Sequence, residues 1–163
     1  MILALTGYMG CGKSTVGRIV ADALGCPFTD LDDEVEKAAG RSIADIFTSD
    51  GEKAFRHLEL QTLLSSIKKY ESGNAVLALG GGTVTIPDAV RLLQDKTLCI
   101  WLKAPVEELQ QRVAGSTRPL ADDSFRERLL TREPLYAAAA HITLDTIGLS
   151  PEQIADEIII DCL

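Results

Sequence analysis

Short apolar runs alternate with longer amphipathic segments along the whole of this chain. Five runs have the length of buried strands: Ile2–Thr6, Pro27–Asp30, Ala75–Leu79, Thr97–Leu102 and His141–Leu144. Between them apolar residues recur at helical spacing, which predicts helices at Lys13–Leu24, Asp33–Ala39, about 51–69, Ala89–Gln94, Val106–Val113, Ser124–Ala139 and Glu152–Asp161. Such alternation indicates an α/β fold, in which helices cover both faces of a parallel sheet.

Two segments interrupt this alternation. Residues 31–74 separate the second and third strands by far more than a crossover needs, and residues 115–123 are rich in Gly, Ser, Thr and Pro. Insertions at the carboxyl ends of parallel strands tend to build the ligand crevice. We therefore expect an acceptor-binding insertion at about 31–74 and a lid at about 112–124, both within one domain, 1–163.

The segment after the first strand, Gly7-Tyr8-Met9-Gly10-Cys11-Gly12-Lys13-Ser14, fits the P-loop pattern. Glycines let the backbone approach a phosphate, and the following helix adds the positive end of its dipole. Lys13 is expected to contact the β- and γ-phosphates and Ser14 to ligate Mg²⁺. A glycine turn that ends in Lys-Ser by chance is the alternative, but the strand–loop–helix context favours a nucleotide site at Gly10, Cys11, Gly12, Lys13, Ser14 and Thr15.

Asp30 and Asp32 lie where the second strand should end. Residues two apart in a strand face the same way, so both carboxylates are expected to face the crevice. One could hold Mg²⁺ through water, and the other could accept a proton from an acceptor hydroxyl. The alternative is that Asp32, Asp33 and Glu34 only favour a helix N-terminus. The third strand ends in glycines rather than in the usual Asp, so the acid for Mg²⁺ must come from elsewhere.

Arg56 and Glu59 are three residues apart in the long insertion helix, so the carboxylate can hold the guanidinium in a fixed rotamer. A fixed guanidinium can bind a carboxylate or phosphate with two hydrogen bonds. From these residues alone an ordinary surface ion pair is the commoner reading. Farther along, Gly80-Gly81-Gly82 removes every side chain at the crevice side of the third strand and exposes N–H groups to a ligand.

Arginines also follow the later strands. Arg118 lies in the expected lid, where it could stabilise charge on a transferring phosphoryl group, although a solvated loop arginine is the alternative. Arg132 and Tyr136 are four residues apart on the next helix and could reach the same crevice. The alternative is that both residues only pack at the edge of the core, with the charged end of Arg132 in water.

Charge and composition limit the kinds of molecule that this protein is expected to bind. The formal net charge is −8 and the pI is about 4.7, which argues against nucleic acid or an anionic membrane surface. An anionic ligand must therefore be attracted by local Arg and Lys side chains. The four cysteines have neither metal nor redox spacing and are expected to be reduced thiols. No apolar run is long enough to span a membrane, and no export signal precedes the first strand, so we expect a cytoplasmic protein.

Taken together, these motifs resemble those of the shikimate kinase family, over nearly the whole chain. The matching pieces are the P-loop at 7–14, Asp-Leu-Asp at 30–32, Ile-Phe-x-x-x-Gly-Glu at 46–52, Phe-Arg-x-x-Glu at 55–59, Gly-Gly-Gly at 80–82, Arg-Pro-Leu at 118–120 and Arg-x-x-x-Tyr at 132–136. The P-loop alone is common to many families, whereas the ordered set is specific.

The resemblance implies transfer of the γ-phosphoryl of MgATP to the 3-hydroxyl of shikimate, a step toward chorismate and aromatic amino acids. It implies a P-loop kinase of the nucleoside-monophosphate-kinase type, a three-layer sandwich with a five-stranded parallel sheet, acting as a monomer. Asp32 would bind ring hydroxyls and orient or deprotonate the attacking one, with Lys13 and Arg118 also catalytic. The resemblance also implies which residues bind each ligand. Shikimate would be bound by Arg56, Arg132, Gly80, Gly81 and Gly82. Mg²⁺ would be bound by Ser14 and Asp30, and ATP by Arg112 and Arg118.

Two rival functions remain at this point. A gluconate kinase would share the fold and also needs cationic groups for a carboxylate, but the full motif set favours shikimate. A regulatory nucleotide-binding module is the rival from another class. A GTPase would carry Asn-Lys-x-Asp, yet the single asparagine, Asn74, is followed by Ala. A catalytically inactive ATP-binding module would lack Lys13, Asp32 or Arg118, and all three are present.

Overall fold

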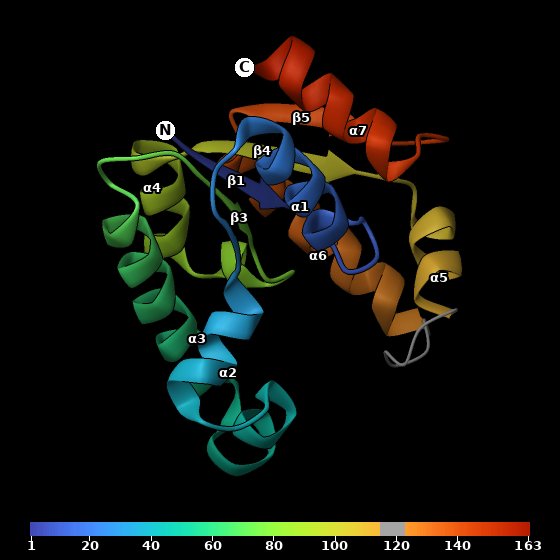
Figure 1. The fold of residues 1–163 in the computed structure, drawn as a ribbon. Helices are drawn as coiled ribbons and strands as arrows, with labels where there is room; N and C mark the ends of the chain where they lie inside the picture. Colours follow the sequence, from blue (N-terminus) through green and yellow to red (C-terminus); the bar gives the residue numbers. More distant parts are fainter. Residues whose placement is uncertain (115–122) are drawn as a thin grey trace.

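A five-stranded parallel sheet forms the centre of the molecule (Figure 1). The computed structural model describes residues 1–114 and 123–163. The strand order is β2-β3-β1-β4-β5, with bounds β1 Ile2–Thr6, β2 Phe28–Asp30, β3 Ala75–Ala78, β4 Leu98–Lys103 and β5 Ile142–Asp145. All five predicted strands are therefore confirmed, and no end differs from its prediction by more than one residue. Every residue of β1 and β3 is buried, as expected of a parallel sheet covered on both faces.

Helices cover the two faces of this sheet, which makes three layers. Helices α1 (Lys13–Leu24) and α7 (Pro151–Glu157) pack together on one face. Helices α3 (Ile43–Lys69), α4 (Pro87–Lys96) and α6 (Asp123–Ala139) lie against the other, and α5 (Val106–Ala114) follows β4 (Figure 1). A short 3₁₀ turn, η1 (Thr83–Thr85), follows β3, and η2 (Ile158–Cys162) continues α7 as a π-helix. Helix α7 begins with a capping box formed by Ser150 and Gln153.

The insertion between β2 and β3 differs from its prediction in two places. Helix α2 (Leu31–Ala39) begins two residues earlier than expected, because the Asp30 carboxylate accepts a hydrogen bond from the Asp32 N–H and caps the helix. Helix α3 begins at Ile43 rather than near residue 51. At Gly51 the backbone takes φ 85° and ψ 172°, so the helix is kinked there, and glycine alone adopts this conformation readily.

The insertion projects from the carboxyl edge of the sheet (Figure 1). It has a small core of its own, built from Val35, Ile46 and Phe55, beside the main core that fills the space between sheet and helices. The rest of α3 runs back along the sheet and buries Leu63 and Ile67 in the main core. One helix thus connects the two cores. Within the described part of the chain, no helix has the length and apolar character needed to cross a membrane.

Candidate active site

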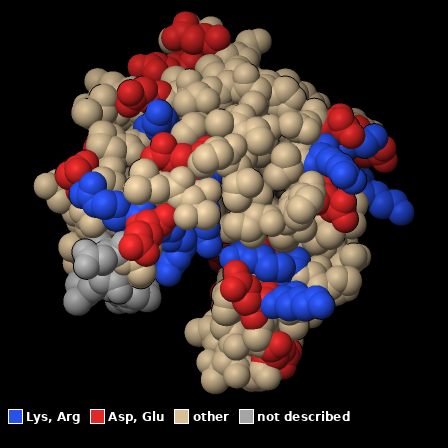
Figure 2. All heavy atoms as spheres, turned by 180° about the vertical axis from the view of Figure 1, so that it is seen from behind, with Lys and Arg blue, Asp and Glu red and all other residues tan. Residues whose placement is uncertain are grey.

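A cavity of about 690 Å³ opens at the carboxyl edge of the sheet, between the insertion and the main body. The P-loop, α2, α3, the glycine loop after β3, α5 and α6 all contribute to its wall. The basic residues that line it are Lys13, Arg56, Arg112, Arg128 and Arg132. Figure 2 shows Lys and Arg side chains gathered along this cleft. A chain with a net charge of −8 thus holds its cationic groups where an anionic ligand would enter.

The P-loop has the predicted context between β1 and α1. Gly7, Gly10 and Gly12 have φ of 146°, 86° and 91°, a region that side chains disfavour. The Lys13 ammonium lies over the loop and donates to the carbonyls of Gly7 at 2.8 Å and Tyr8 at 3.2 Å. The loop and its lysine therefore form a compact cationic cradle at the N-terminus of α1, as phosphate binding requires.

Ser14 and Asp30 meet at the base of the cavity. The Ser14 hydroxyl donates to Asp30 Oδ2 at 2.5 Å, while Asp30 Oδ1 caps α2. No group of three or more His, Cys, Asp or Glu side chains among the described residues could hold a metal. A hydroxyl and one carboxylate nevertheless fit Mg²⁺, which usually takes few protein ligands and completes its shell with phosphate oxygens and water.

Asp32 lines the cavity, but not for the reason predicted. The sequence argument placed Asp30 and Asp32 in one strand, facing the same way, and this is wrong. Asp30 ends β2, whereas Asp32 lies in the first turn of α2. Capping by Asp30 turns the chain into a helix at this point, so both carboxylates reach the cavity from the strand-to-helix corner. The position of Asp32, Asp33 and Glu34 in the first turn of α2 also agrees with the alternative, that these acids favour a helix N-terminus.

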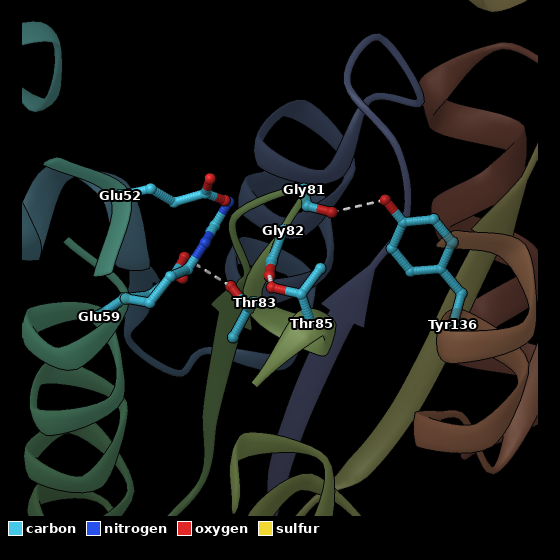
Figure 3. Close-up of polar contacts among 8 residues, drawn as sticks. Glu52, Glu59, Gly81, Gly82, Thr83, Thr85 and Tyr136 are labelled. Atoms are coloured by element: carbon cyan, nitrogen blue, oxygen red, sulfur yellow. Dashed lines mark hydrogen bonds and ion pairs between the residues drawn. The ribbon is translucent and has the colours of Figure 1, made fainter. Parts of the chain in front are cut away.

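Arg56 is not in an ordinary surface ion pair. Its Nη1 donates to Glu59 Oε1 at 2.8 Å, and the Glu59 side chain is completely buried. The second oxygen of Glu59 accepts from the Thr83 hydroxyl at 2.8 Å (Figure 3). Arg56 Nε is buried and has no hydrogen-bond partner among the described residues. The guanidinium is thus fixed on one edge, which is the preorganised arrangement that anion binding needs.

The glycine loop leaves room for these side chains. A Cβ on Gly82 would lie 2.6 Å from Arg56 Cζ, and one on Gly80 would lie 2.7 Å from Glu59 Oε2 and 2.9 Å from Asp32 Oδ1. Gly82 itself has an ordinary φ of −110°, so space rather than backbone conformation requires glycine here. Residues 80–82 therefore let Arg56, Glu59 and Asp32 converge on one point.

Helix α6 forms the opposite wall. Arg132 lines the cavity, and its Cζ lies 5.8 Å from the centre of the Tyr8 ring. Tyr136, one turn farther along, is completely buried and donates its hydroxyl to the Gly81 carbonyl at 2.5 Å. Sequence analysis missed Arg128, an exposed residue one turn before Arg132 that also lines the cavity. Its i, i+4 spacing to Arg132 was the available signal.

Arg112 lies on the nucleotide side of the cavity. Its Nη1 donates to the Gly10 carbonyl at 3.1 Å and its Nη2 to Glu108 Oε1 at 2.5 Å. The residue is thus fixed against the P-loop, as its expected contact with ATP requires. Arg118 and most of the predicted lid lie outside the described residues.

The fold, with a P-loop and a cavity lined by basic residues at the carboxyl edge of a parallel sheet, defines a P-loop kinase. The chain belongs to the shikimate kinase family, whose family model matches residues 9–163. It is 41% identical over 167 residues to a shikimate kinase of Caulobacter vibrioides, covering 99% of this chain and 81% of that one. It is 39% identical over 164 residues to a shikimate kinase of Enterococcus faecalis, covering 96% and 95%.

A solved structure agrees with the sequence relatives. Shikimate kinase from Acinetobacter baumannii, determined in complex with shikimate, superposes with a TM-score of 0.86 at 33% identity, covering 97% of this chain and 90% of that one. Family membership favours shikimate kinase over the gluconate kinase and regulatory alternatives. The chain is an ATP-dependent kinase of this family, and ATP with Mg²⁺ is its phosphoryl donor.

Proposed function

We propose that the cavity at the carboxyl edge of the sheet is where this kinase transfers the γ-phosphoryl of MgATP to the 3-hydroxyl of shikimate. The observation that carries this proposal is the fixed Arg56 guanidinium, which faces the P-loop across one continuous cavity. A donor cradle and an anchored anion site in the same cavity are what transfer between two bound molecules needs.

The nucleotide side consists of the P-loop and its neighbours. Backbone N–H groups of residues 10–15 and the Lys13 ammonium bind the phosphates, and Arg112 contacts the nucleotide from α5. Ser14 and Asp30 are the residues that would hold Mg²⁺, the hydroxyl directly and the carboxylate through water. The ion neutralises charge on the β- and γ-phosphates when it is bound. Lys13 then needs to shift only from the carbonyls of its own loop to phosphate oxygens.

The acceptor side consists of α2, α3, α6 and the glycine loop. Arg56 and Arg132 bind the shikimate carboxylate, together with N–H groups of residues 80–82. Asp32 binds ring hydroxyls and orients, or takes the proton from, the attacking 3-hydroxyl. Its position at the N-terminus of α2, next to Gly80 and in the same cavity as Arg56 and the P-loop, supports this role.

The reaction requires positioning and charge stabilisation more than covalent help from the protein. We assign residues 31–74 to acceptor binding and residues 112–124 to a lid that excludes water, the competing acceptor. Arg118 is proposed to reach the transferring phosphoryl group from that lid.

We further propose that the chain works as a monomer in the cytoplasm, on the pathway toward chorismate. The four cysteines are free thiols, as is usual in a reducing compartment.

A coupled ADP-release assay tests the proposed function. Turnover is measured with MgATP and shikimate, with gluconate, and with no acceptor. We expect strong turnover with shikimate alone. Turnover only with gluconate would preserve the kinase mechanism and overturn the acceptor assignment. ATP binding without turnover on either acceptor would favour a regulatory module.

A further inference from the structure

We propose that Tyr136 is a positioning residue for the acceptor: its hydroxyl fixes the Gly81–Gly82 peptide so that the Gly82 N–H faces the shikimate carboxylate. This inference rests on the acceptor site proposed above. It concerns a residue that acts on the acceptor through the backbone of the glycine loop rather than by contact with the substrate.

The contact is specific, and the tyrosine that makes it is buried. Tyr136 has no exposed side-chain surface, and its hydroxyl lies 2.5 Å from the Gly81 carbonyl oxygen, 55 residues away in the sequence. The ring lies 5.7 Å, centre to centre, from the Trp101 ring of β4. A phenol held by its ring against the sheet is a rigid donor, since it has few rotatable bonds to reposition.

The carbonyls of Gly80 and Gly82 accept a different kind of hydrogen bond than the carbonyl of Gly81 does. Gly80 O accepts from the Thr83 N–H at 3.2 Å, and Gly82 O accepts from the Thr85 N–H at 3.0 Å and from its hydroxyl at 2.6 Å. Those bonds belong to the local turn. The Gly81 carbonyl instead points out of the turn toward α6 (Figure 3). Its direction is therefore set by a residue distant in sequence.

Fixing this carbonyl also fixes the next N–H. The described peptide bonds are all trans, and the peptide unit is planar, so the Gly82 N–H points opposite to the Gly81 carbonyl. Tyr136 and the Glu59 side of the cavity lie on opposite sides of the glycine loop (Figure 3). The Gly82 N–H thus points away from α6, toward the side on which Arg56 lies against Gly82.

Glycine makes such a support necessary. Three glycines in succession have more accessible backbone conformations than any other tripeptide, and β3 already ends at Ala78. Without a support, part of the binding free energy would be lost in ordering the loop. Burial raises the pKa of the Tyr136 phenol, opposed in part by the charge of Arg132, so the hydroxyl remains a donor at neutral pH.

The test compares Tyr136→Phe with Tyr70→Phe. Both variants lose one phenolic hydroxyl, but the Tyr70 hydroxyl bonds to Thr29 at 2.9 Å, outside the cavity. We expect Tyr136→Phe to raise the KM for shikimate about five- to tenfold, the range set by one lost hydrogen bond, with the KM for ATP changed less than about twofold. Tyr70→Phe should change neither KM, although both variants should melt at a lower temperature.

A measurement on the unaltered protein makes the test independent of how well the variant folds. With saturating shikimate, the amide proton resonance of Gly82 should shift downfield, and the shift should shrink in Tyr136→Phe. No shift in the unaltered protein would overturn the inference. Equal increases of the KM for shikimate and the KM for ATP in Tyr136→Phe would show that Tyr136 has only a structural role. This result would also overturn the inference. If the unaltered protein did not turn over shikimate at all, the proposed function itself would fail, which is a separate result.

Discussion

Glu59 and Arg56 form an ion pair in which the carboxylate is completely buried while the guanidinium keeps 17% of its side-chain surface exposed to the cavity. The second Glu59 oxygen is bonded to Thr83, so both oxygens are satisfied inside the protein. Arg56 is therefore held by a carboxylate inside the protein, while its Nη2 lies 3.5 Å from Glu52 Oε1 and its buried Nε has no hydrogen-bond partner among the described residues. This asymmetry distinguishes the pair from an exposed ion pair, which is worth little.

Glu59→Gln removes the charge that orients Arg56 and keeps the size of the side chain. We expect the KM for shikimate to rise about tenfold or more, because a charge-assisted hydrogen bond is worth about 1.5–3 kcal/mol. The KM for ATP should change little. Glu52→Gln is the matched control, since Glu52 is 65% exposed and lies 3.5 Å from the same guanidinium. Equal effects of the two variants would mean that burial of Glu59 has no part in binding.

Asp32→Asn should depress turnover and leave ATP binding nearly intact. The backbone N–H that bonds Asp30 is retained, so the corner between β2 and α2 should keep its geometry. We expect kcat to fall about 10²–10⁴-fold, the usual contribution of a proton acceptor. Glu34→Gln alters charge in the same helical turn but pairs with Lys37, so it should stay near the original rate. Loss of ATP affinity with unchanged turnover per bound ATP would disprove the role.

Asp30→Asn should raise the Mg²⁺ concentration needed for half-maximal rate about tenfold, because an amide is a weaker ligand than a carboxylate. Asparagine caps helices as well as aspartate does, so α2 should still begin at Leu31. The measurement is the rate as a function of Mg²⁺ at fixed ATP, with far-ultraviolet circular dichroism to check helix content. An unchanged Mg²⁺ dependence would contradict the assignment of Asp30 to the metal.

The fold and the P-loop could be predicted because both are local properties of the sequence. Strand and helix periodicity, and a glycine pattern between them, are visible within a short window. The start of α2 could not be placed correctly, because the Asp30 side chain outcompetes continued strand pairing and caps a helix instead. Likewise, the sequence pattern predicts only the part of α3 that follows Gly51, whereas the helix begins at Ile43 and continues across a kink at Gly51.

The residues that hold the site in place were less predictable than the residues that face the cavity. Arg56, Asp32 and Arg132 could be named from motifs. Thr83 and Tyr136 could not be assigned partners, since those partners lie 24 and 55 residues away in the sequence. Periodicity shows that a residue is buried, but it does not show which polar group the residue meets there. Only the packed structure determines that Glu59 and Gly81 are those groups.

The buried thiol of Cys99 should make the protein less stable in alkali. Burial raises the pKa of Cys99 to about 12, from an ordinary 9.0. The folded state therefore keeps the proton that the unfolded state releases, and stability is constant below about pH 8 and falls as pH rises from about 9 to 12. This one group can contribute a slope of up to about 1.4 kcal/mol per pH unit.

Urea unfolding at several pH values, with reductant present, measures that slope. Cys99→Ala should lose some stability at neutral pH because it leaves a small cavity. Its decline above pH 9 should nevertheless be shallower than that of the unaltered protein. Parallel declines would show that Cys99 does not titrate with unfolding and that other groups, such as the buried Tyr136, determine the alkaline limit.

Arg128→Gln should weaken binding of MgATP. Arg128 lines the cavity one helical turn before Arg132, and two cations at i, i+4 repel each other unless an anion lies between them or beside them. Because it lies on the end of α6 that follows the lid segment, we place this residue beside the phosphates rather than beside the acceptor. We expect the KM for MgATP to rise about three- to tenfold, with a smaller change for shikimate, and the effect to weaken in added salt.

Arg126→Gln is the matched control for this prediction. Arg126 lies on the same helix, is exposed like Arg128, and pairs with Glu107 at 3.3 Å away from the cavity. Loss of the same charge should therefore leave the KM for MgATP within about twofold, because only screened, longer-range interactions remain. A rise of similar size in both variants would assign the effect to net charge. A rise in shikimate KM alone in Arg128→Gln would move this residue to the acceptor side of the cavity.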